Sequence, residues 1–579
     1  MSPAQPSLRD ELVFPTTCPC ANSSAAHGGP CREVGKRACS NCLLVLYCSK
    51  ECQAAHWKQH KIHCKSESMK ITWEPDWTIR PTREGWENHQ EVFDTLRKQK
   101  YLWGNIPAID VLNLEQNEGA SYDKNMNLLF AASGDLRNVI KSIAGVSADS
   151  PRSFTAILND REINVVARNT ILLLTALYAD DVSDAAVVML HIWYSALIPS
   201  SVLRFLHATV LPLIREVCEK TAGKPADSLL AKTFTRGTRS LRVVLKKSCW
   251  DLLPTYLEVR DGLTVWEATQ TRRMALTLER GNHRGDPINL YVQPPGPRTA
   301  ILEYRKDGVI MPFGTSKVAF DTPNPTMFRE QGVWPQIMSA FDPTDGWTLK
   351  DLLQKTPLAK NDVYGGMFFH VRDILENFCS KIKDLKINFV LLHKEASALP
   401  KTLAQDFKLT QSFDRIEISN IIDSYLVGPC CLNLFTPLLR PVAENPHATL
   451  LTGFTHSIAE MGNEPVLRQE FRGSLDRTRK RTARYFPQPP ETMDKRTKWL
   501  HSYAGAMFQD WDGLFAHFMR TRGVMAFAVA AGAQPKEENT IIDPWPLRLK
   551  ENATPEELEL AIRSAHTGEE RYVEWKRAS

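Results

Sequence analysis

The most regular pattern of apolar and polar positions lies between residues 126 and 180. Residues 126–143, MNLLFAASGDLRNVIKSI, predict a short apolar strand, a turn of small residues and a helix that begins near Asp135. A second apolar strand, FTAILND, ends at Asp160, and the residues after it have apolar positions at helical spacing. Strands and helices that alternate at these lengths predict parallel strands joined by crossover helices.

Later segments predict further strands of the same sheet. Residues 413–454 predict a strand ending at Asn420, a helical stretch to Leu439 and a strand through Leu450 and Leu451. INFVLLHKEA predicts another strand. Most of residues 181–286, including ADSLLAKTFTRGTRSLRVVLKK, is interpreted as helical and predicts an insertion.

The carboxyl-terminal part of the chain predicts helices. Residues 492–533 carry aromatic and aliphatic residues three and four positions apart, which is typical of core packing. Thr554, with Glu557 three residues later, is a helix-start pattern of the capping-box kind. The expected fold is therefore α/β, with a Rossmann-like, methyltransferase-like domain over residues 96–455, a helical insertion at about 181–286, and a helical carboxyl-terminal region and tail over 456–579.

A cofactor site is one interpretation of the first strand and helix. Ligands of doubly wound sheets sit beside a helix N-terminus at the carboxyl ends of the strands, and an acid after the second strand can hold a ribose hydroxyl. Gly134, Asp135 and Asp160 would then bind S-adenosylmethionine. Only Gly134 stands where nucleotide binders usually have two or three glycines, so the alternative is that Gly134 and Asp135 simply form the turn and the helix cap.

Composition excludes few classes of function. The net charge of +5 over 579 residues gives no strong nucleic-acid signal. The basic run at 477–484, RTRKRTAR, fits a nuclear import segment, a patch for an acidic partner or a solvated helix face. The longest uncharged stretch, from Ala185 to Leu203, is interrupted by Pro199 and is too short to cross a membrane.

Cysteine is distributed unevenly along the chain. Eight of the 13 cysteines lie in the first 64 residues. Residues 1–17, which we expect to be disordered, have no apolar core typical of a secretory signal peptide. A chain that is not secreted, and is therefore nuclear or cytoplasmic, keeps its thiols reduced, so this cluster predicts zinc rather than disulfides.

The spacing of the ligand types supports zinc. Three short pairs, Cys39 with Cys42, Cys48 with Cys52, and His60 with Cys64, can each place two ligands on one ion, and a fourth pair would complete two tetrahedral sites. The strings YCSKECQ and HWKQHKIHC closely resemble the MYND-type zinc finger. Ligand pairs interleave in that family. The resemblance implies that Cys48 and Cys52 share an ion with the first pair, and that Cys39, Cys42, His60 and Cys64 hold the other.

The first ligand pair departs from the family pattern, because the loop before Cys31 is longer. We predict Cys20 and Cys31, with Cys18 and His27 as alternatives. His56 lies four residues before His60 and shares its helix face, but its neighbour Trp57 favours a packed position. The expected finger spans residues 18–64, and residues 65–95 are expected to be a linker.

A finger whose coordination positions are all filled by protein has no place for a catalytic water, so it is structural. The resembled family docks short proline-containing peptides of protein partners along a groove lined by Gln and Trp, and Gln53 and Trp57 occupy those positions here. The alternative is that Trp57 only covers the zinc ions.

A second resemblance covers about residues 95–455. The strings WGNIPAIDVLNL, LLFAASGDLRNVI and FDRIEISNIID resemble a domain of unknown function shared by fungal MYND-finger proteins and the amino-terminal half of dynein axonemal assembly factor three. That family lends little chemistry. Asp342 and Asp345 stand in a Pro/Gly-rich turn that favours backbone contacts over acid-base catalysis. The first hypothesis is a non-catalytic zinc adaptor, and the second is a methyltransferase-like enzyme.

Overall fold

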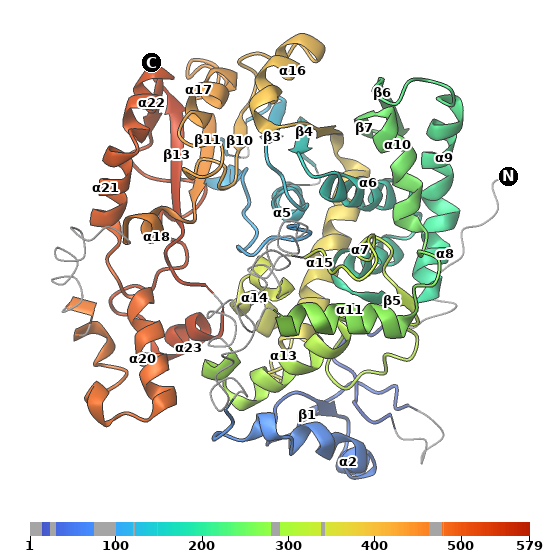
Figure 1. Ribbon diagram of the computed structural model, residues 1–579, viewed down its shortest axis with the longest axis vertical. Coiled ribbons are helices and arrows are strands. Elements are labelled where there is room, and N and C mark those ends of the chain that lie inside the picture. The colour runs from blue at the N-terminus through green and yellow to red at the C-terminus, as the bar shows by residue number, and fades with distance from the viewer. Residues whose placement is uncertain are drawn as a thin grey trace. The chain divides into compact units, whose positions relative to one another are not determined.

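The computed structural model describes residues 14–23, 30–74, 100–119, 122–147, 149–278, 290–336, 342–462, 477–478, 480–564 and 566–578 (Figure 1). The chain forms two compact units, each built from three stretches. The first unit comprises Met1–Pro107, Ala167–Leu229 and Lys246–Ser380. The second unit comprises Ala108–Val166, Leu230–Leu245 and Lys381–Ser579.

A mixed β-sheet is the centre of the second unit. Among the described residues it has nine strands, in the order β12-β13-β11-β10-β3-β4-β9-β7-β6. In that order their bounds are Ala533–Pro535, Arg571–Arg577, Thr449–Phe454, Arg415–Glu417, Met126–Phe130, Ser153–Asp160, Lys386–His393, Arg239–Lys246 and Leu229–Arg236. The five pairings from β11 through β10, β3, β4 and β9 to β7 are parallel, whereas β13 is antiparallel to β11 and β12.

The register of the central strands follows from their apolar runs. Leu128 of β3 lies opposite Ala156 of β4 and, on the other side, opposite Arg415 of β10. Leu128, Leu129 and Ala156 are all buried, as expected for parallel strands covered on both faces. β3 lies between β4 and β10. The chain adds β4 and β9 on one side of β3 and later adds β10 and β11 on its other side, so the connections run in opposite directions from β3.

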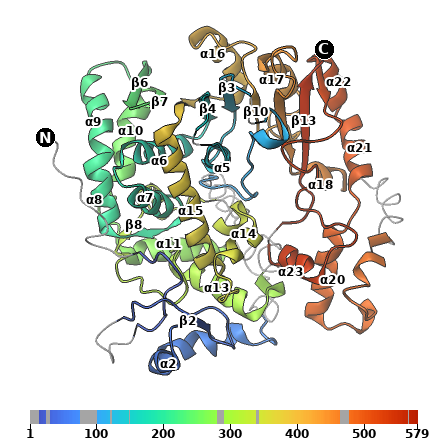
Figure 2. The same cartoon turned by 180° about the vertical axis from the view of Figure 1, so that it is seen from behind.

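The helices of the second unit lie beside this sheet or below it in Figures 1 and 2. They are α5 (Arg137–Ala144), α16 (Leu399–Asp406), α17 (Cys431–Phe435), α18 (Ser457–Gly462), α20 (Lys495–Met507), α21 (Asp512–Thr521), α22 (Val524–Ala530) and α23 (Pro555–Arg563). Of these, α20 and α23 lie below the sheet in both views. Short 3₁₀ turns are η3 (Leu114–Gln116), η8 (Ala396–Ala398), η9 (Thr436–Leu438) and η10 (Pro490–Thr492). The predicted capping box of α23 is present, because Thr554 and Glu557 bond each other's backbone amides.

The first unit combines a small amino-terminal module with a helical body. The module contains β1 (Arg37–Ala38), β2 (Leu46–Tyr47), α2 (Lys50–Cys64) and η2 (Glu67–Met69). The helices of the body are α7 (Val182–Tyr194), α8 (Ser200–Thr209), α9 (Leu211–Lys220), α10 (Lys247–Leu252), α11 (Val265–Leu278), α13 (Pro295–Asp307) and α14 (Leu349–Gln354). Its remaining elements are β5 (Leu197–Ile198), β8 (Thr322–Pro323), η4 (Leu253–Leu257) and η7 (Pro343–Gly346). Two of the unit boundaries fall within helices, namely α6 (Ile163–Tyr178) and α15 (Val363–Asp384).

The predicted α/β class is confirmed, and the predicted strands around Asp160, Leu450 and INFVLLHKEA are present as β4, β11 and β9. The helical interpretation of residues 226–247 was wrong, because this segment forms the strands β6 and β7. Phe234 is buried between exposed neighbours, and Gly237 adopts φ +62° in the turn. Alternating burial with β-branched residues stabilises strands here, and glycine permits the turn between them.

The expected helical carboxyl-terminal region and tail also contains strands, since β12 and β13 join the sheet. β13 hides a charged residue, Glu574, which is fully buried. Its carboxylate accepts hydrogen bonds from Lys536 Nζ at 2.9 Å and from the backbone amide of Ile541 at 2.7 Å. Because these donors compensate the buried charge, a segment that looks polar in sequence can be an inner strand.

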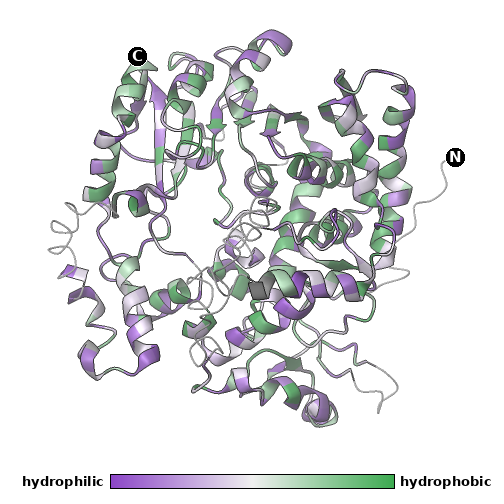
Figure 3. Ribbon diagram, in the orientation of Figure 1, coloured by the Kyte–Doolittle hydropathy of each residue, from purple (hydrophilic) through white to green (hydrophobic). Residues whose placement is uncertain are grey.

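No helix in the described ranges is both long enough and apolar enough to cross a bilayer. The apolar helix α7 has 13 residues, and all from Asp184 to Tyr194 are buried in the first unit. Green predominates along the middle of α7 in Figure 3, whereas α2 carries more purple.

Candidate metal centres

Two clusters of metal-binding side chains lie on the scaffold of β1, β2 and α2. The side chain of Ser49 accepts a hydrogen bond from the amide of Cys52 at 3.2 Å and so caps the first turn of α2. The chain approaches β2 closely at Gly35, where a Cβ atom would lie 2.3 Å from the Cβ of Leu46. Short spacings along a capped helix and a tight loop therefore fix the directions of the ligands.

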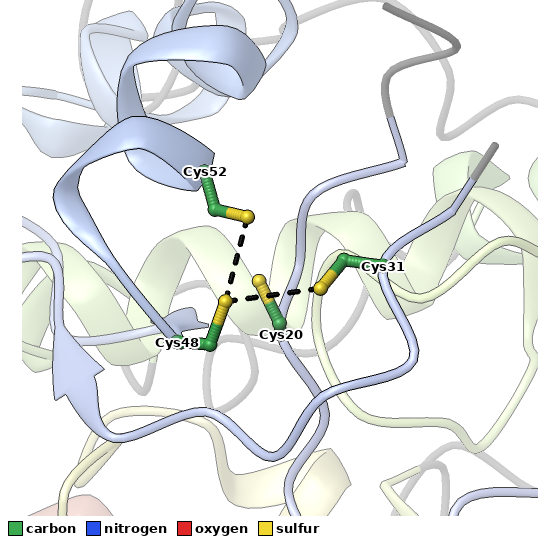
Figure 4. Close-up of side chains that lie close together, drawn as sticks. All are labelled: Cys20, Cys31, Cys48 and Cys52. Atoms are coloured by element: carbon green, nitrogen blue, oxygen red, sulfur yellow. Dashed lines mark hydrogen bonds between the residues drawn. The ribbon is translucent and has the colours of Figure 1, made fainter. Parts of the chain in front are cut away.

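The first centre consists of four cysteines from three separate segments (Figure 4). They are Cys20, Cys31, Cys48 and Cys52, and their sulfur atoms all lie within 4.8 Å of one another. The Sγ atoms of Cys31 and Cys48 are 3.7 Å apart, and those of Cys48 and Cys52 are 3.4 Å apart. All four are free thiols.

These distances fit a tetrahedral zinc ion. With Zn–S bonds of about 2.3 Å, tetrahedral geometry places the sulfur atoms about 3.8 Å apart. The measured separations are far longer than the S–S bond of a disulfide, about 2.05 Å. A hydrogen bond with the Asn22 side chain lowers the pKa of Cys52, which favours the thiolate form that a metal requires.

The second centre consists of Cys39, Cys42, His60 and Cys64, all of them buried. The Sγ atoms of Cys39 and Cys64 are 3.7 Å apart, and Cys42 Sγ lies 3.5 Å from His60 Nε2. The hydrogen bond with Cys42 lowers the pKa of Cys39, which favours the thiolate form that a metal requires. The donor set of three thiolates and one imidazole is typical of structural zinc.

An outer hydrogen bond orients the last ligand of the second centre. Asn41 Nδ2 donates to Cys64 Sγ at 3.2 Å and to the carbonyl oxygen of the same residue at 2.8 Å. Such outer contacts fix a ligand's direction and tune its charge. Sequence reasoning missed Asn41, although its position between Cys39 and Cys42 was a usable signal.

The alternative ligands lie elsewhere. Cys18 is in neither cluster; its thiol donates to the carbonyl oxygen of Lys355 at 3.7 Å, and burial raises its pKa to about 11. His27 is outside the described residues. His56 is buried, and its Nδ1 is hydrogen-bonded to the hydroxyl of Tyr47 at 3.0 Å. These positions give His56 a packing role beside the second centre.

Comparison with known families agrees with this geometry, because the MYND finger family matches residues 26–64. Residues 26–64 form a MYND finger. A second family, described as a domain of unknown function (DUF4470), matches residues 102–198. No curated protein and no solved structure matches the chain. The MYND match begins after Cys20, which the structure nevertheless places in the first centre.

The MYND finger is bound tightly to the helical body of the first unit. Asn361 Nδ2 donates to the carbonyl oxygen of Cys42 at 2.9 Å, and the backbone amide of Asn361 donates to the carbonyl oxygen of Leu43 at 3.1 Å. On α2, His63 Nδ1 lies 3.3 Å from Glu303 of α13. A ligand of the second centre is therefore contacted directly by a loop more than 300 residues away in sequence.

The beginning of the expected linker also contacts α13. Arg298 donates to the carbonyl oxygens of Ser68 and Lys70 at 2.8 and 2.7 Å, and the hydroxyls of Ser68 and Thr299 are 2.8 Å apart. Residues 65–74 thus hold the finger against the body. Residues 75–95 of the expected linker lie outside the described residues.

The predicted peptide-binding pair lies on α2 one helical turn apart. Trp57 is 37% exposed, and its ring meets His60 edge-on with centroids 6.0 Å apart. Lys65 Nζ lies 5.6 Å from the ring centroid of Trp57. Gln53 is half-buried. Trp57 therefore both covers a ligand of the second centre and presents an aromatic surface to solvent.

The candidate cofactor residues are brought together in the second unit, but Gly134 and Asp160 bond each other and Asp135 bonds Arg137. Gly134 adopts φ +52°, and its amide donates to one oxygen of Asp160 at 3.0 Å. The other oxygen of Asp160 accepts from the amide of Glu162 at 2.9 Å, and burial raises the pKa of this carboxyl. Asp135 accepts from the amide and from Nε of Arg137, at 3.2 and 2.8 Å. Both carboxylates thus stabilise the turn and the start of α5.

Proposed function

We propose that the chain is a zinc-dependent adaptor whose MYND finger holds two zinc ions and docks a proline-containing segment of a protein partner over Gln53 and Trp57. The observation that carries this proposal is the pair of four-ligand clusters, with ligand atoms within 4.8 Å of one another. The first centre would be held by four thiolates and the second by three thiolates and His60. With four protein ligands each, neither ion would bind the water that catalysis needs. The ions would supply folding free energy of about 10 kcal/mol each.

Metal analysis of the purified full-length protein tests the zinc proposal. We expect two zinc ions per chain, and Cys52→Ser should lower the value to one. Cys218→Ser is the matched control, because the Cys218 thiol donates to the carbonyl oxygen of Trp250 and lies in neither centre. Retention of two zinc ions by Cys52→Ser would contradict the assignment of the first centre.

Binding to an immobilised library of proline-containing peptides tests the docking proposal. Trp57→Ala should abolish capture while zinc content stays at two. Trp499→Ala is the matched control, since Trp499 is 38% exposed on α20 of the second unit. Equal capture by wild type and Trp57→Ala would leave Trp57 with a covering role only.

The strand order supports a further proposal, that the second unit is a Rossmann-like scaffold without a cofactor. The parallel order β9-β4-β3-β10-β11 corresponds to the 3-2-1-4-5 order of doubly wound sheets. The hydrogen bond from the Gly134 amide to Asp160 argues for a structural turn rather than a site for S-adenosylmethionine. Calorimetric titration with S-adenosylmethionine should show no heat; binding that Asp160→Ala removes would favour the methyltransferase-like enzyme.

A further inference from the structure

Exposed lysines lie next to the proposed peptide site. Gln53, Trp57, Lys61 and Lys65 follow one another at intervals of four residues, so they form a single row along α2 and its cap. Lys58 stands beside this row. The three lysines are exposed, and none makes an ion pair with a described residue.

The neighbouring face of the same helix is already occupied. His63 points to Glu303 of α13, and His60 and Cys64 point to the second centre. The only acidic residue of α2, Glu51, lies in the first turn, away from the lysines. The free side of the helix therefore combines one aromatic ring, one apolar side chain, Ile62, which is 68% exposed, and three positive charges.

We propose that this surface selects partner peptides that carry acidic residues beside the segment docked on Trp57. The proposal rests on the docking function proposed above and adds the chemistry of the partner. From Trp57 to Lys65 the helix rises about 12 Å. An extended peptide covers this distance in about four residues. The Asp or Glu side chains should therefore lie within about four residues of the docked segment, where they would meet Lys58, Lys61 and Lys65.

Two other roles of the lysines predict different behaviour. Lysines near a helix C-terminus stabilise the helix dipole. They can also offset the excess negative charge of the zinc-thiolate clusters, about −2 for four thiolates and −1 for three. In both cases their removal would lower zinc retention, whether or not a peptide is present. In the proposed role their removal changes only the affinity for acidic peptides and its dependence on salt.

The test compares synthetic peptides with one proline-containing core and either Glu or Gln at the flanking positions. Binding to the zinc-loaded full-length protein is measured by fluorescence anisotropy at 0.05 and 0.5 M salt. We expect the Glu peptide to bind about 5- to 30-fold more tightly than the Gln peptide at low salt, as three exposed charge pairs would allow. This preference should shrink at high salt, where the screening length is shorter.

The variant Lys58→Gln/Lys61→Gln/Lys65→Gln should remove the preference and keep two zinc ions. Its matched control replaces three exposed lysines elsewhere with Gln, namely Lys224, Lys350 and Lys401. Equal affinity for both peptides, with Trp57→Ala abolishing both, would overturn this inference and leave the docking function intact. Failure of every peptide would overturn both.

Two further results would also overturn the inference. Loss of zinc from the triple lysine variant would assign the lysines to the metal clusters. Tight, Trp57-dependent binding of a single-stranded oligonucleotide, with no preference between the peptides, would assign the surface to nucleic acid. The same triple variant therefore serves every arm of the experiment.

Discussion

Asn361→Ala should loosen the MYND finger from the helical body and speed the loss of one zinc ion. Asn361 of the body bonds a residue of the second centre directly, through Nδ2 to the carbonyl oxygen of Cys42 at 2.9 Å. Cys42 is fully buried, so its carbonyl has no ready access to water once the amide is removed. The backbone bond from Asn361 to Leu43 is retained in the variant. The perturbation is therefore confined to one hydrogen bond and its buried acceptor.

The expected magnitude follows from that acceptor. A buried carbonyl left without its donor costs about 1–3 kcal/mol. This free energy shifts the equilibrium between docked and undocked finger by about 5- to 150-fold. Because the second centre faces the body while the first does not contact Asn361, only the zinc of the second centre should be released faster.

Chelator-driven zinc release, followed with a chromophoric indicator, measures this effect as two phases. One phase should accelerate in Asn361→Ala, and the other should match wild type. Gln354→Ala is the matched control, since Gln354 is an exposed amide at the end of α14. Unchanged release of both ions would refute the coupling. Equal acceleration of both phases would show general destabilisation instead of undocking.

Three other changes have definite expected outcomes. Gly296→Ala would place a Cβ 2.8 Å from the carbonyl oxygen of Cys42, so its zinc release should accelerate in the same phase. Burial raises the pKa of Glu417 to about 7, so the folded state holds a proton that the unfolded chain loses above about pH 4.5. Stability in urea should therefore fall as pH rises from 5 to 7, and Glu417→Gln should flatten this dependence. Burial opposes ionisation of Glu118, but the ion pair with Arg415 at 2.7 Å outweighs burial and lowers the pKa of this carboxyl. Because Glu118→Ala would leave the buried Arg415 without this partner, it should lower the free energy of unfolding, measured in urea, by about 3–5 kcal/mol.

Local spacing allowed the metal centres to be predicted because most ligands are close in sequence. His60 and Cys64 stand one turn apart at the end of α2, so helical geometry aims that pair, whereas Cys52 lies in the first turn and Cys48 just before the N-cap Ser49, so the cap aims the other pair. The first pair was harder, because a long loop separates Cys20 from Cys31. An isolated bridge between Cys20 and Leu46 of β2 selects this cysteine over Cys18, and no short-range pattern encodes that pairing.

Long-range contacts are the part that the sequence could not supply. Apolar runs predicted β3 and β4 and placed Gly134 and Asp160 at neighbouring strand ends. They could not show that the two oxygens of Asp160 accept from the amides of Gly134 and Glu162. Nor does any local pattern link Asn361 to the finger. The hairpin of β6 and β7 was missed because the same charged, β-branched residues fit either periodicity over a short window.

The position of the finger also bears on how it would bind a partner. The contacts with the body use His63 and the loop at Cys42, which leaves the row from Gln53 through Trp57 to Lys61 on the open side of α2. A finger held in this way presents its row on a rigid support. Fixing a binding surface in advance reduces the entropy lost on association, so even a short peptide can bind usefully. Undocking by Asn361→Ala should therefore weaken peptide binding as well as zinc retention, although Asn361 bonds the loop at Cys42 and Leu43.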